Sequence, residues 1–114
     1  MPDTEGTAEP LPARLLQDTA SMFALLSATV RLHILWLLTG GDRDVGTHAD
    51  ETGQSIATVS HHLGKLKLAG LVDSRRAGKR QIYVVADSHV VQVVRLAIEW
   101  RLEQSQPGRR ARHA

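Results

Sequence analysis

The sequence contains no cysteine, which excludes disulfide bonds and every metal site built on thiolates. It also has no long apolar run, because the longest block, Leu32–Leu38, is interrupted by His33 and is far too short to cross a bilayer. The first residues are acidic and contain no apolar stretch of the signal-peptide type. We therefore expect a cytoplasmic protein without a membrane segment.

The sequence also lacks the patterns of an enzyme. Gly40-Gly41 and the isolated glycines do not form a glycine-rich phosphate loop. Ser60 and His61 are neighbours in the chain, but consecutive residues of a helix do not face each other, so they do not make a nucleophile and its base. We expect no catalytic residue and no required cofactor.

The length of 114 residues predicts one domain, small enough that dimerisation would help its stability. We expect this domain over residues 13–105. Residues 1–12 combine proline, glycine and acidic side chains, which is typical of a disordered arm. Residues 106–114 form a basic tail, which is either a solvated end or an additional arm for DNA phosphates.

The charge is small overall but unevenly distributed. The net charge is +2, yet residues 1–53 carry −5, residues 54–80 carry +5 and residues 81–114 carry +2. A compact basic surface of this kind is what binding to phosphates requires. The alternative, a domain that binds only other proteins, has no need of the basic middle segment.

Residues 54–70 predict a helix suited to a DNA groove. The Ser55 hydroxyl can accept from the amide of Ala57 or Thr58 and so cap the helix, and Gly70 ends it. Apolar residues recur at spacings of three and four, which predicts a buried side made of Ile56, Val59, Leu63 and Leu66. Small and polar residues on the other side suit close approach to bases and phosphates, although ordinary solvated helices share this pattern. The residues expected to contact DNA are Ser55, Ala57, Thr58, Ser60, His61, His62 and Lys65 in this helix and Arg76, Lys79 and Arg80 in the hairpin after it.

The rest of the chain predicts the element order ααααββα, a mainly α fold with a β-hairpin wing, that is, a winged helix-turn-helix. A first helix is expected over residues 15–26, a second from a cap at Ser27 to about Leu38, and a short third over residues 47–52. The strands are expected over residues 71–75 and 81–85, with a tight turn at residues 77–79. A last helix starts at a cap, Asp87 or Ser88, and runs to about Ser105.

The last helix is apolar on more than one side, which is typical of a helix that packs against a partner, unless its own chain buries it. We expect the first and last helices to form a homodimer. Two recognition helices would then lie one turn apart on a palindromic operator in double-stranded DNA. The apolar residues are Val90, Val91, Val93, Val94, Leu96, Ala97, Ile98, Trp100 and Leu102.

Several of these segments are similar to the motifs of one family. Residues 26–35 read Leu-Ser-Ala-Thr-Val-Arg-Leu-His-Ile-Leu, residues 60–63 read Ser-His-His-Leu, and residues 69–72 and 76–79 read Ala-Gly-Leu-Val and Arg-Ala-Gly-Lys. With them, about residues 15–105 resemble the ArsR/SmtB family of metal-responsive repressors, and most resemble its nickel, cobalt and zinc sensors. Residues 28–30 depart from it, because the family usually has Asp-Pro-Thr there. The resemblance implies a DNA-binding repressor whose DNA complex loosens when an inducer binds.

The resemblance also implies where a metal would bind. The family's third-helix site uses Cys-x-Cys, which residues 45–47 lack. Its last-helix site takes ligands from both protomers, and here it offers Asp87, His89 and Glu103, with Trp100 at a fourth position where it cannot ligate. This oxygen-rich set predicts weak binding of Ni²⁺ or Zn²⁺ at most, completed by a second regulatory protein or ligand. Alternatively, Asp87 is only a helix cap and His89 a solvated side chain.

The remaining histidines outside the recognition helix are expected to be structural or solvated. They are His33, His48 and His113, and His48 stands where the family usually has an apolar residue.

Overall fold

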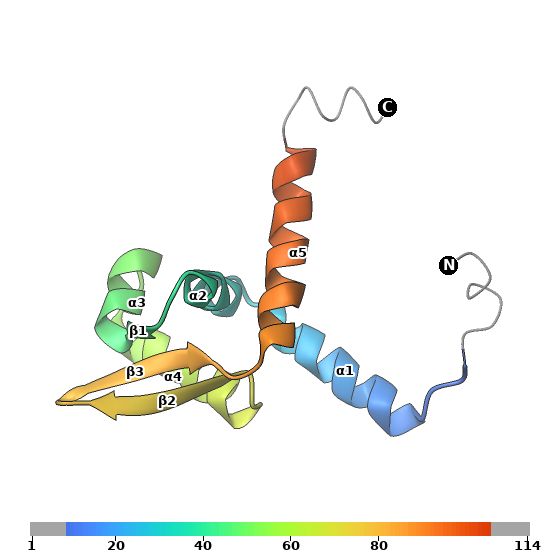
Figure 1. Cartoon of the computed structure of the whole chain (residues 1–114), viewed down its shortest axis with the longest axis horizontal. Helices are drawn as coiled ribbons and strands as arrows, with labels where there is room; N and C mark the ends of the chain where they lie inside the picture. The colour runs from blue at the N-terminus through green and yellow to red at the C-terminus, as the bar shows by residue number, and fades with distance from the viewer. Residues whose placement is uncertain (1–8, 106–114) are drawn as a thin grey trace.

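The computed structural model describes residues 9–105, which form five helices and a three-stranded sheet (Figure 1). The helices are α1 (Ala13–Leu26), α2 (Thr29–Thr39), α3 (Val45–Thr52), α4 (Ile56–Leu68) and α5 (Ser88–Gln104). The strands are β1 (Arg43–Asp44), β2 (Val72–Ala77) and β3 (Arg80–Val85). The predictions for residues 106–114, for His113 and for residues 1–8 of the arm lie outside the described residues.

The core lies where α2, α3 and α4 meet the sheet and the first half of α5. Its side chains are aliphatic, so burial of apolar surface is the main stabilising contribution. The buried apolar residues are Leu26, Ile34, Leu35, Leu38, Ala49, Val59, Leu63, Leu66, Leu71, Val72, Ile82 and Val94. α2 and α4 each contribute three of them, so these two helices form the centre of the body.

The helix starts follow from the residues before them. The Ser55 hydroxyl accepts a hydrogen bond from the Thr58 amide at 3.1 Å, which confirms the predicted cap of α4. The prediction was wrong for α3, which begins at Val45 because the Asp44 carboxylate accepts from the Thr47 amide at 2.8 Å. It was also wrong for α2, because the Ser27 hydroxyl donates back to the Ala24 carbonyl at 2.7 Å instead of capping the next helix.

The sheet has one strand more than predicted. β1 is only two residues long and pairs antiparallel with β3, placing Arg43 opposite Tyr83 and Asp44 opposite Ile82. A two-residue strand leaves no alternation in the sequence, which is why the pattern did not reveal it. The strand order is β1-β3-β2, so the middle of β3 is fastened to the segment that precedes α3.

The β2–β3 hairpin extends further than predicted. Ala77 pairs with Arg80, so the turn consists of Gly78 and Lys79 alone and the strands reach beyond residues 71–75 and 81–85. Gly78 adopts a φ of 66°, which suits the first position of a two-residue hairpin turn. The longer strands carry the basic residues out to the tip, at the left of Figure 1. The winged helix-turn-helix fold is therefore confirmed, with the added strand β1.

The helices α1 and α5 project from the body in different directions (Figure 1). α1 and α2 meet at an angle of 89°. Among residues 9–105 no single helix has the length and apolar character to span a membrane, and α1 and α2 meet that test only when counted together across their bend. Both projecting helices expose apolar side chains, including Phe23 on α1 and Leu96 and Trp100 on α5.

Candidate nucleic-acid interface

The helix-turn-helix consists of α3 and α4. Gly53 ends α3 with a φ of 73°, and its amide donates to the Ala49 carbonyl at 3.0 Å. This left-handed conformation favours glycine and turns the chain sharply toward the cap at Ser55. α4 therefore starts immediately after α3 and packs across it, which leaves the first turns of α4 at the surface.

The exposed side of α4 carries the polar residues that the sequence predicted for DNA contact. Ser60, His61 and Lys65 are exposed, as is Ala57, while Val59 and Leu63 on the opposite side are fully buried. Thr58 is half-buried, and its hydroxyl accepts from the Ser55 hydroxyl at 3.0 Å, so this pair also stabilises the helix start. Contact with DNA stays a prediction for each of these residues.

The exposure of Ile56 differs from what the sequence predicted. The sequence assigned it to the buried side, but 58% of this residue is exposed. It has the right spacing from Val59, but it is the first residue of α4, where no neighbouring element within residues 9–105 covers it. An apolar side chain is thus presented at the start of the helix, among residues suited to a groove.

His62 lies at the edge of the exposed side. It is half-buried, and its Nδ1 atom is 3.1 Å from Nη1 of Arg31 on α2. Partial burial lowers the pKa of His62 below its usual value, and the nearby charges of Arg31, His61 and Lys65 act in the same direction. No local pattern in the sequence indicates this contact, because the two residues are 31 positions apart.

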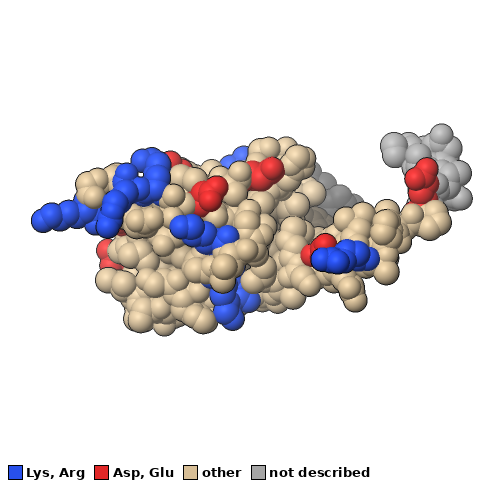
Figure 2. Space-filling view, turned by 90° about the horizontal axis from the view of Figure 1, so that it is seen from below, with Lys and Arg blue, Asp and Glu red and all other residues tan. Residues whose placement is uncertain are grey.

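The wing carries the largest gathering of positive charge in Figure 2. Arg76 and Lys79 are exposed and form no ion pair within residues 9–105, so their charges are available to phosphates. Arg80 differs, because its Nε donates to Oδ2 of Asp44 at 2.7 Å. Arg75 pairs more loosely with Asp42, at 3.4 Å.

Asp44 joins the wing to the helix-turn-helix. One carboxylate oxygen caps α3 through the Thr47 amide, and the other accepts from Arg80 on β3. The hydrogen bonds from Thr47, together with Arg80, lower the pKa of Asp44 to about 2. The sequence analysis missed this residue, although an aspartate three residues before Thr47 is a recognisable capping pattern.

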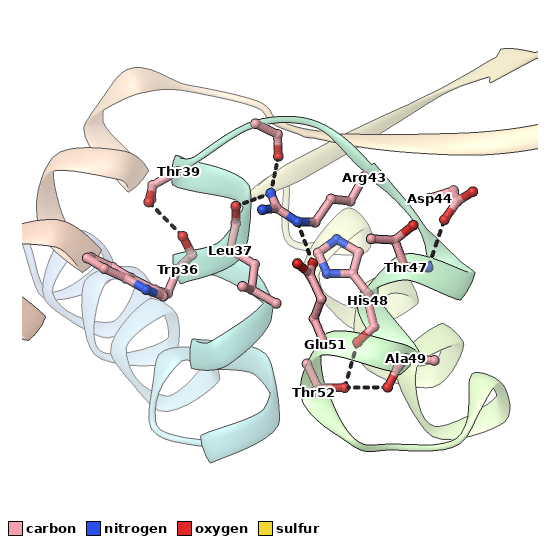
Figure 3. A network of polar contacts seen from close by, with 11 residues as sticks. Trp36, Leu37, Thr39, Arg43, Asp44, Thr47, His48, Ala49, Glu51 and Thr52 are labelled. Carbon is pink, nitrogen blue, oxygen red and sulfur yellow. Dashed lines mark hydrogen bonds and ion pairs between the residues drawn. The ribbon is translucent and has the colours of Figure 1, made fainter.

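A polar cluster fixes the turn between α2 and α3 (Figure 3). The Arg43 guanidinium donates to the Leu37 carbonyl, to the Gly41 carbonyl at 2.6 Å and to Glu51 on α3 at 2.6 Å. The His48 ring lies beside Arg43 and Glu51 in Figure 3 and is fully buried. Of the two alternatives predicted for His48, structural or solvated, the structure shows the structural one.

The predicted metal ligands are not brought together within one chain. Asp87 caps α5, and its Oδ1 is 2.7 Å from both the amide nitrogen and Nδ1 of His89. The bond from the His89 amide lowers the pKa of Asp87. Glu103 lies fourteen residues after His89 on the same helix, which corresponds to a separation of about 21 Å at the rise of an α-helix. Among residues 9–105, no three potential ligands lie close enough together to hold one metal ion.

An apolar groove runs between α1 and α5. It has a volume of about 760 Å³ and is open to solvent. Phe23 lies on its α1 side, Leu96 and Trp100 lie on its α5 side, and Glu99 and Glu103 line it as well. At the position where the family resemblance implied a fourth ligand, this chain therefore places the aromatic ring of Trp100 in the groove.

A helix-turn-helix with an exposed polar recognition helix and a basic wing defines a DNA-binding protein of the winged helix-turn-helix class. Residues 29–74 match the family model described as the arsR family of bacterial regulatory proteins. The HTH-type transcriptional regulator KmtR of Mycobacterium tuberculosis is 33% identical over 100 residues, which cover 88% of this chain and 76% of that protein. The probable mercury resistance operon repressor of Streptomyces lividans is 36% identical, over 81% and 73% of the two chains.

A solved structure agrees with these relatives. It is the homodimeric winged helix-turn-helix DNA-binding domain of a possible ArsR-family transcriptional regulator from Mycobacterium bovis. The TM-score is 0.75 at 36% identity, and the match covers 87% of this chain and 94% of that one. The chain belongs to the ArsR family and is a DNA-binding transcriptional regulator of that type.

Proposed function

We propose that the protein acts as a homodimer that binds a palindromic operator and represses the genes behind it. The observation that carries this proposal is the pair of exposed apolar surfaces on α1 and α5, which face the same groove. A second copy would cover this groove and hold two α4 helices at a fixed spacing. The homodimeric state of the related Mycobacterium bovis domain supports the proposal. We propose no catalytic role for the protein. Because the DNA of a bacterial cell lies in the cytoplasm, we propose that the protein acts there.

On each half-site we assign α4 to the major groove and the wing to the backbone or the minor groove. Ser60, His61 and Lys65 would meet base edges and phosphates, because they are exposed on one side of α4. Arg76 and Lys79 would neutralise phosphates, because they are exposed at the wing.

Fluorescence anisotropy with promoter DNA and a scrambled duplex of equal length tests the assignment, in a salt titration. We expect Ser60→Ala or His61→Ala to weaken binding to the operator by roughly 1–3 kcal/mol and to relax its sequence preference. Lys79→Ala should weaken both duplexes alike. Equal affinity of the parent for both duplexes would argue against sequence-specific regulation, and absence of DNA binding would favour a protein-interaction module.

For the inducer we propose that a divalent metal alone has little effect. Asp87 already caps α5 and binds His89, and Trp100 stands where a fourth donor is needed, so Asp87, His89 and the partner's Glu103 are a poor fit to a tight Ni²⁺ or Zn²⁺ site. A further ligand or a second regulatory protein would complete the response. The relation to a probable mercury resistance repressor supports a metal-linked signal in general.

Calorimetry with Ni²⁺ and Zn²⁺ tests this second proposal. We expect weak binding by the parent and much tighter binding by Trp100→His, which supplies the missing imidazole. Since an imidazole must be neutral to ligate, binding should weaken as the pH is lowered. Nanomolar metal binding by the parent, coupled to release of DNA, would establish an ordinary metal sensor instead.

A further inference from the structure

We propose that Arg31 is a positioning residue for DNA recognition, which orients the His62 ring so that it presents an N–H donor to DNA and which ties that ring to the end of α1. The DNA contact of His62 rests on the proposed function. The link between Arg31 and His62 rests on the geometry of the folded chain alone.

Arg31 connects three helices with one side chain. It lies in the first turn of α2, and its Nε donates to the Leu25 carbonyl in the last turn of α1 at 2.8 Å. Its Nη1 lies 3.1 Å from Nδ1 of His62 on α4. The Leu25 carbonyl is one of the last four of α1, which have no partner within their own helix, so a guanidinium there also complements the negative end of that helix.

The donor chemistry of Arg31 decides the state of the ring. A guanidinium has only donors, so Nδ1 of His62 must accept. The neutral ring then carries its hydrogen on Nε2, and this N–H can donate to guanine O6 or N7, to thymine O4 or to a phosphate. A protonated ring would lose the acceptor atom and place a cation against Arg31.

The residues around His62 also favour the neutral form of its ring. Arg31 faces it from α2, and His61 and Lys65 lie near it on its own helix. The rings of His61 and His62 meet edge to face with centroids 5.5 Å apart. Partial burial and these three neighbours all lower the pKa of His62, so the donor on Nε2 persists at neutral pH.

The same contact links DNA recognition to the projecting helix. Because Arg31 bonds both Leu25 and His62, a displacement of the end of α1 must either move His62 or break one of the two bonds. A signal received on α1 therefore has a direct route to the recognition helix.

Nuclear magnetic resonance without DNA tests whether Arg31 orients the His62 ring. We would record ring ¹⁵N shifts and a pH titration of His62 in the parent, Arg31→Gln and Arg31→Lys. We expect the parent ring to carry its hydrogen on Nε2. Arg31→Gln should give a mixture of tautomers and a pKa closer to the ordinary value. Arg31→Lys keeps the charge and one donor, so it should retain the parent tautomer. Arg14→Gln, which removes an exposed charge from α1, is the matched control.

Measurements of DNA binding at pH 7.5 and 6.0, with operator and scrambled duplexes, test whether the oriented His62 ring contributes to recognition. Arg31→Gln should lose roughly tenfold in its preference for operator at pH 7.5, the effect of one hydrogen bond to a well-placed donor. At pH 6.0 the affinity of Arg31→Gln for scrambled DNA should rise, because His62 gains a proton. This rise should be larger than the rise in the parent. Arg14→Gln should keep the parent's preference and pH response.

The outcomes separate the two proposals. A parent that binds no operator contradicts the proposed function, while the resonance experiment still decides the link between Arg31 and His62. A parent tautomer and titration in Arg31→Gln, or an unchanged preference, would overturn the positioning role. If Arg31→Gln does not fold, Arg31→Lys takes its place: it should keep the parent tautomer and the parent's operator preference together. A folded Arg31→Lys that loses the tautomer but keeps the preference would overturn the role.

Discussion

His48 is fully buried, yet within residues 9–105 neither of its ring nitrogens has a hydrogen-bond partner. Leaving polar atoms buried without partners costs stability, and a buried charge would cost more. Burial, with a contribution from Arg43, therefore lowers the pKa of His48 to about 4. The ring is held neutral beside the ion pair of Arg43 and Glu51.

We predict that the stability of the fold falls with pH between about 6.5 and 4. The unfolded chain binds a proton at His48 in this range and the folded chain does not, so the free energy of unfolding decreases as the pH falls, by at most about 3 kcal/mol from this residue. Urea unfolding at pH 7.5, 6 and 5 measures it. His48→Leu should be more stable and lose most of this dependence, whereas His33→Gln, an exposed control, should keep it. A parent equally stable at all three pH values would contradict the assignment.

The exposed Ile56 side chain leads to a second residue-scale prediction. An apolar group at the start of α4 suits the methyl group of a thymine in the major groove. We expect Ile56→Ala to bind operator more weakly. We also expect it to respond less than the parent when single operator thymines are replaced by uracil, which lacks the methyl group. If no uracil substitution separates the parent from Ile56→Ala, Ile56 does not read a thymine.

At the scale of the elements, two neighbouring cations at the tip of the wing differ in whether the fold binds them. Arg80 at the start of β3 is bound by Asp44, while Lys79 lies in the turn without such a partner among residues 9–105. The two residues are adjacent in sequence and have the same charge, but their roles in the fold differ. Substituting them therefore separates phosphate binding from wing anchoring.

We predict that Lys79→Ala lowers the slope of log affinity against log salt by about one unit and leaves stability unchanged. Arg80→Ala should weaken DNA binding too, but it should also reduce the thermal stability of the fold, because Asp44 loses its partner. Anisotropy in a salt series and a thermal melt measure both effects. Indistinguishable melts for the two variants would mean that the Asp44 pair does not anchor the wing.

The elements also show what the sequence could predict. Apolar spacing and turn residues predicted all five helices and both strands of the hairpin, because these signals are local, and capping residues predicted the starts of α4 and α5. The strand β1, the bond between Arg31 and His62 and the pair of Asp44 and Arg80 were missed, since each joins residues far apart in the chain. Ile56 was misassigned because spacing identifies the side of a helix but not how far its neighbours extend. The predicted DNA contacts and the metal ligands shared between protomers stay predictions.

For the whole molecule, the decisive feature is apolar surface that one chain leaves uncovered. Leu96 is 72% exposed and Trp100 59% exposed, whereas Val94 on the same helix is 1% exposed. Val94 belongs to the core of its own chain, so a charge there would unfold the protein rather than separate protomers. Leu96 is the appropriate residue for testing the dimer.

We predict that Leu96→Glu is a folded monomer with much weaker operator binding, because a charge in the groove opposes burial against a partner. Sedimentation velocity at micromolar concentration and anisotropy measure the two effects. Gln92→Glu, an exposed charge change on α5, is the control. A monomeric parent would contradict the proposal, as would a dimeric Leu96→Glu with parental affinity for operator.

The double role of Asp44 has a mechanical consequence. The Asp44 carboxylate holds both the start of α3 and the first residue of β3 beside the turn of the wing, so the wing and α3 behave as a single rigid unit. In a dimer, the two rigid units can dissociate from a palindromic operator only when the distance or angle between them changes. Any inducer would then act by changing that distance or angle, and the wing and α3 would move together as it does.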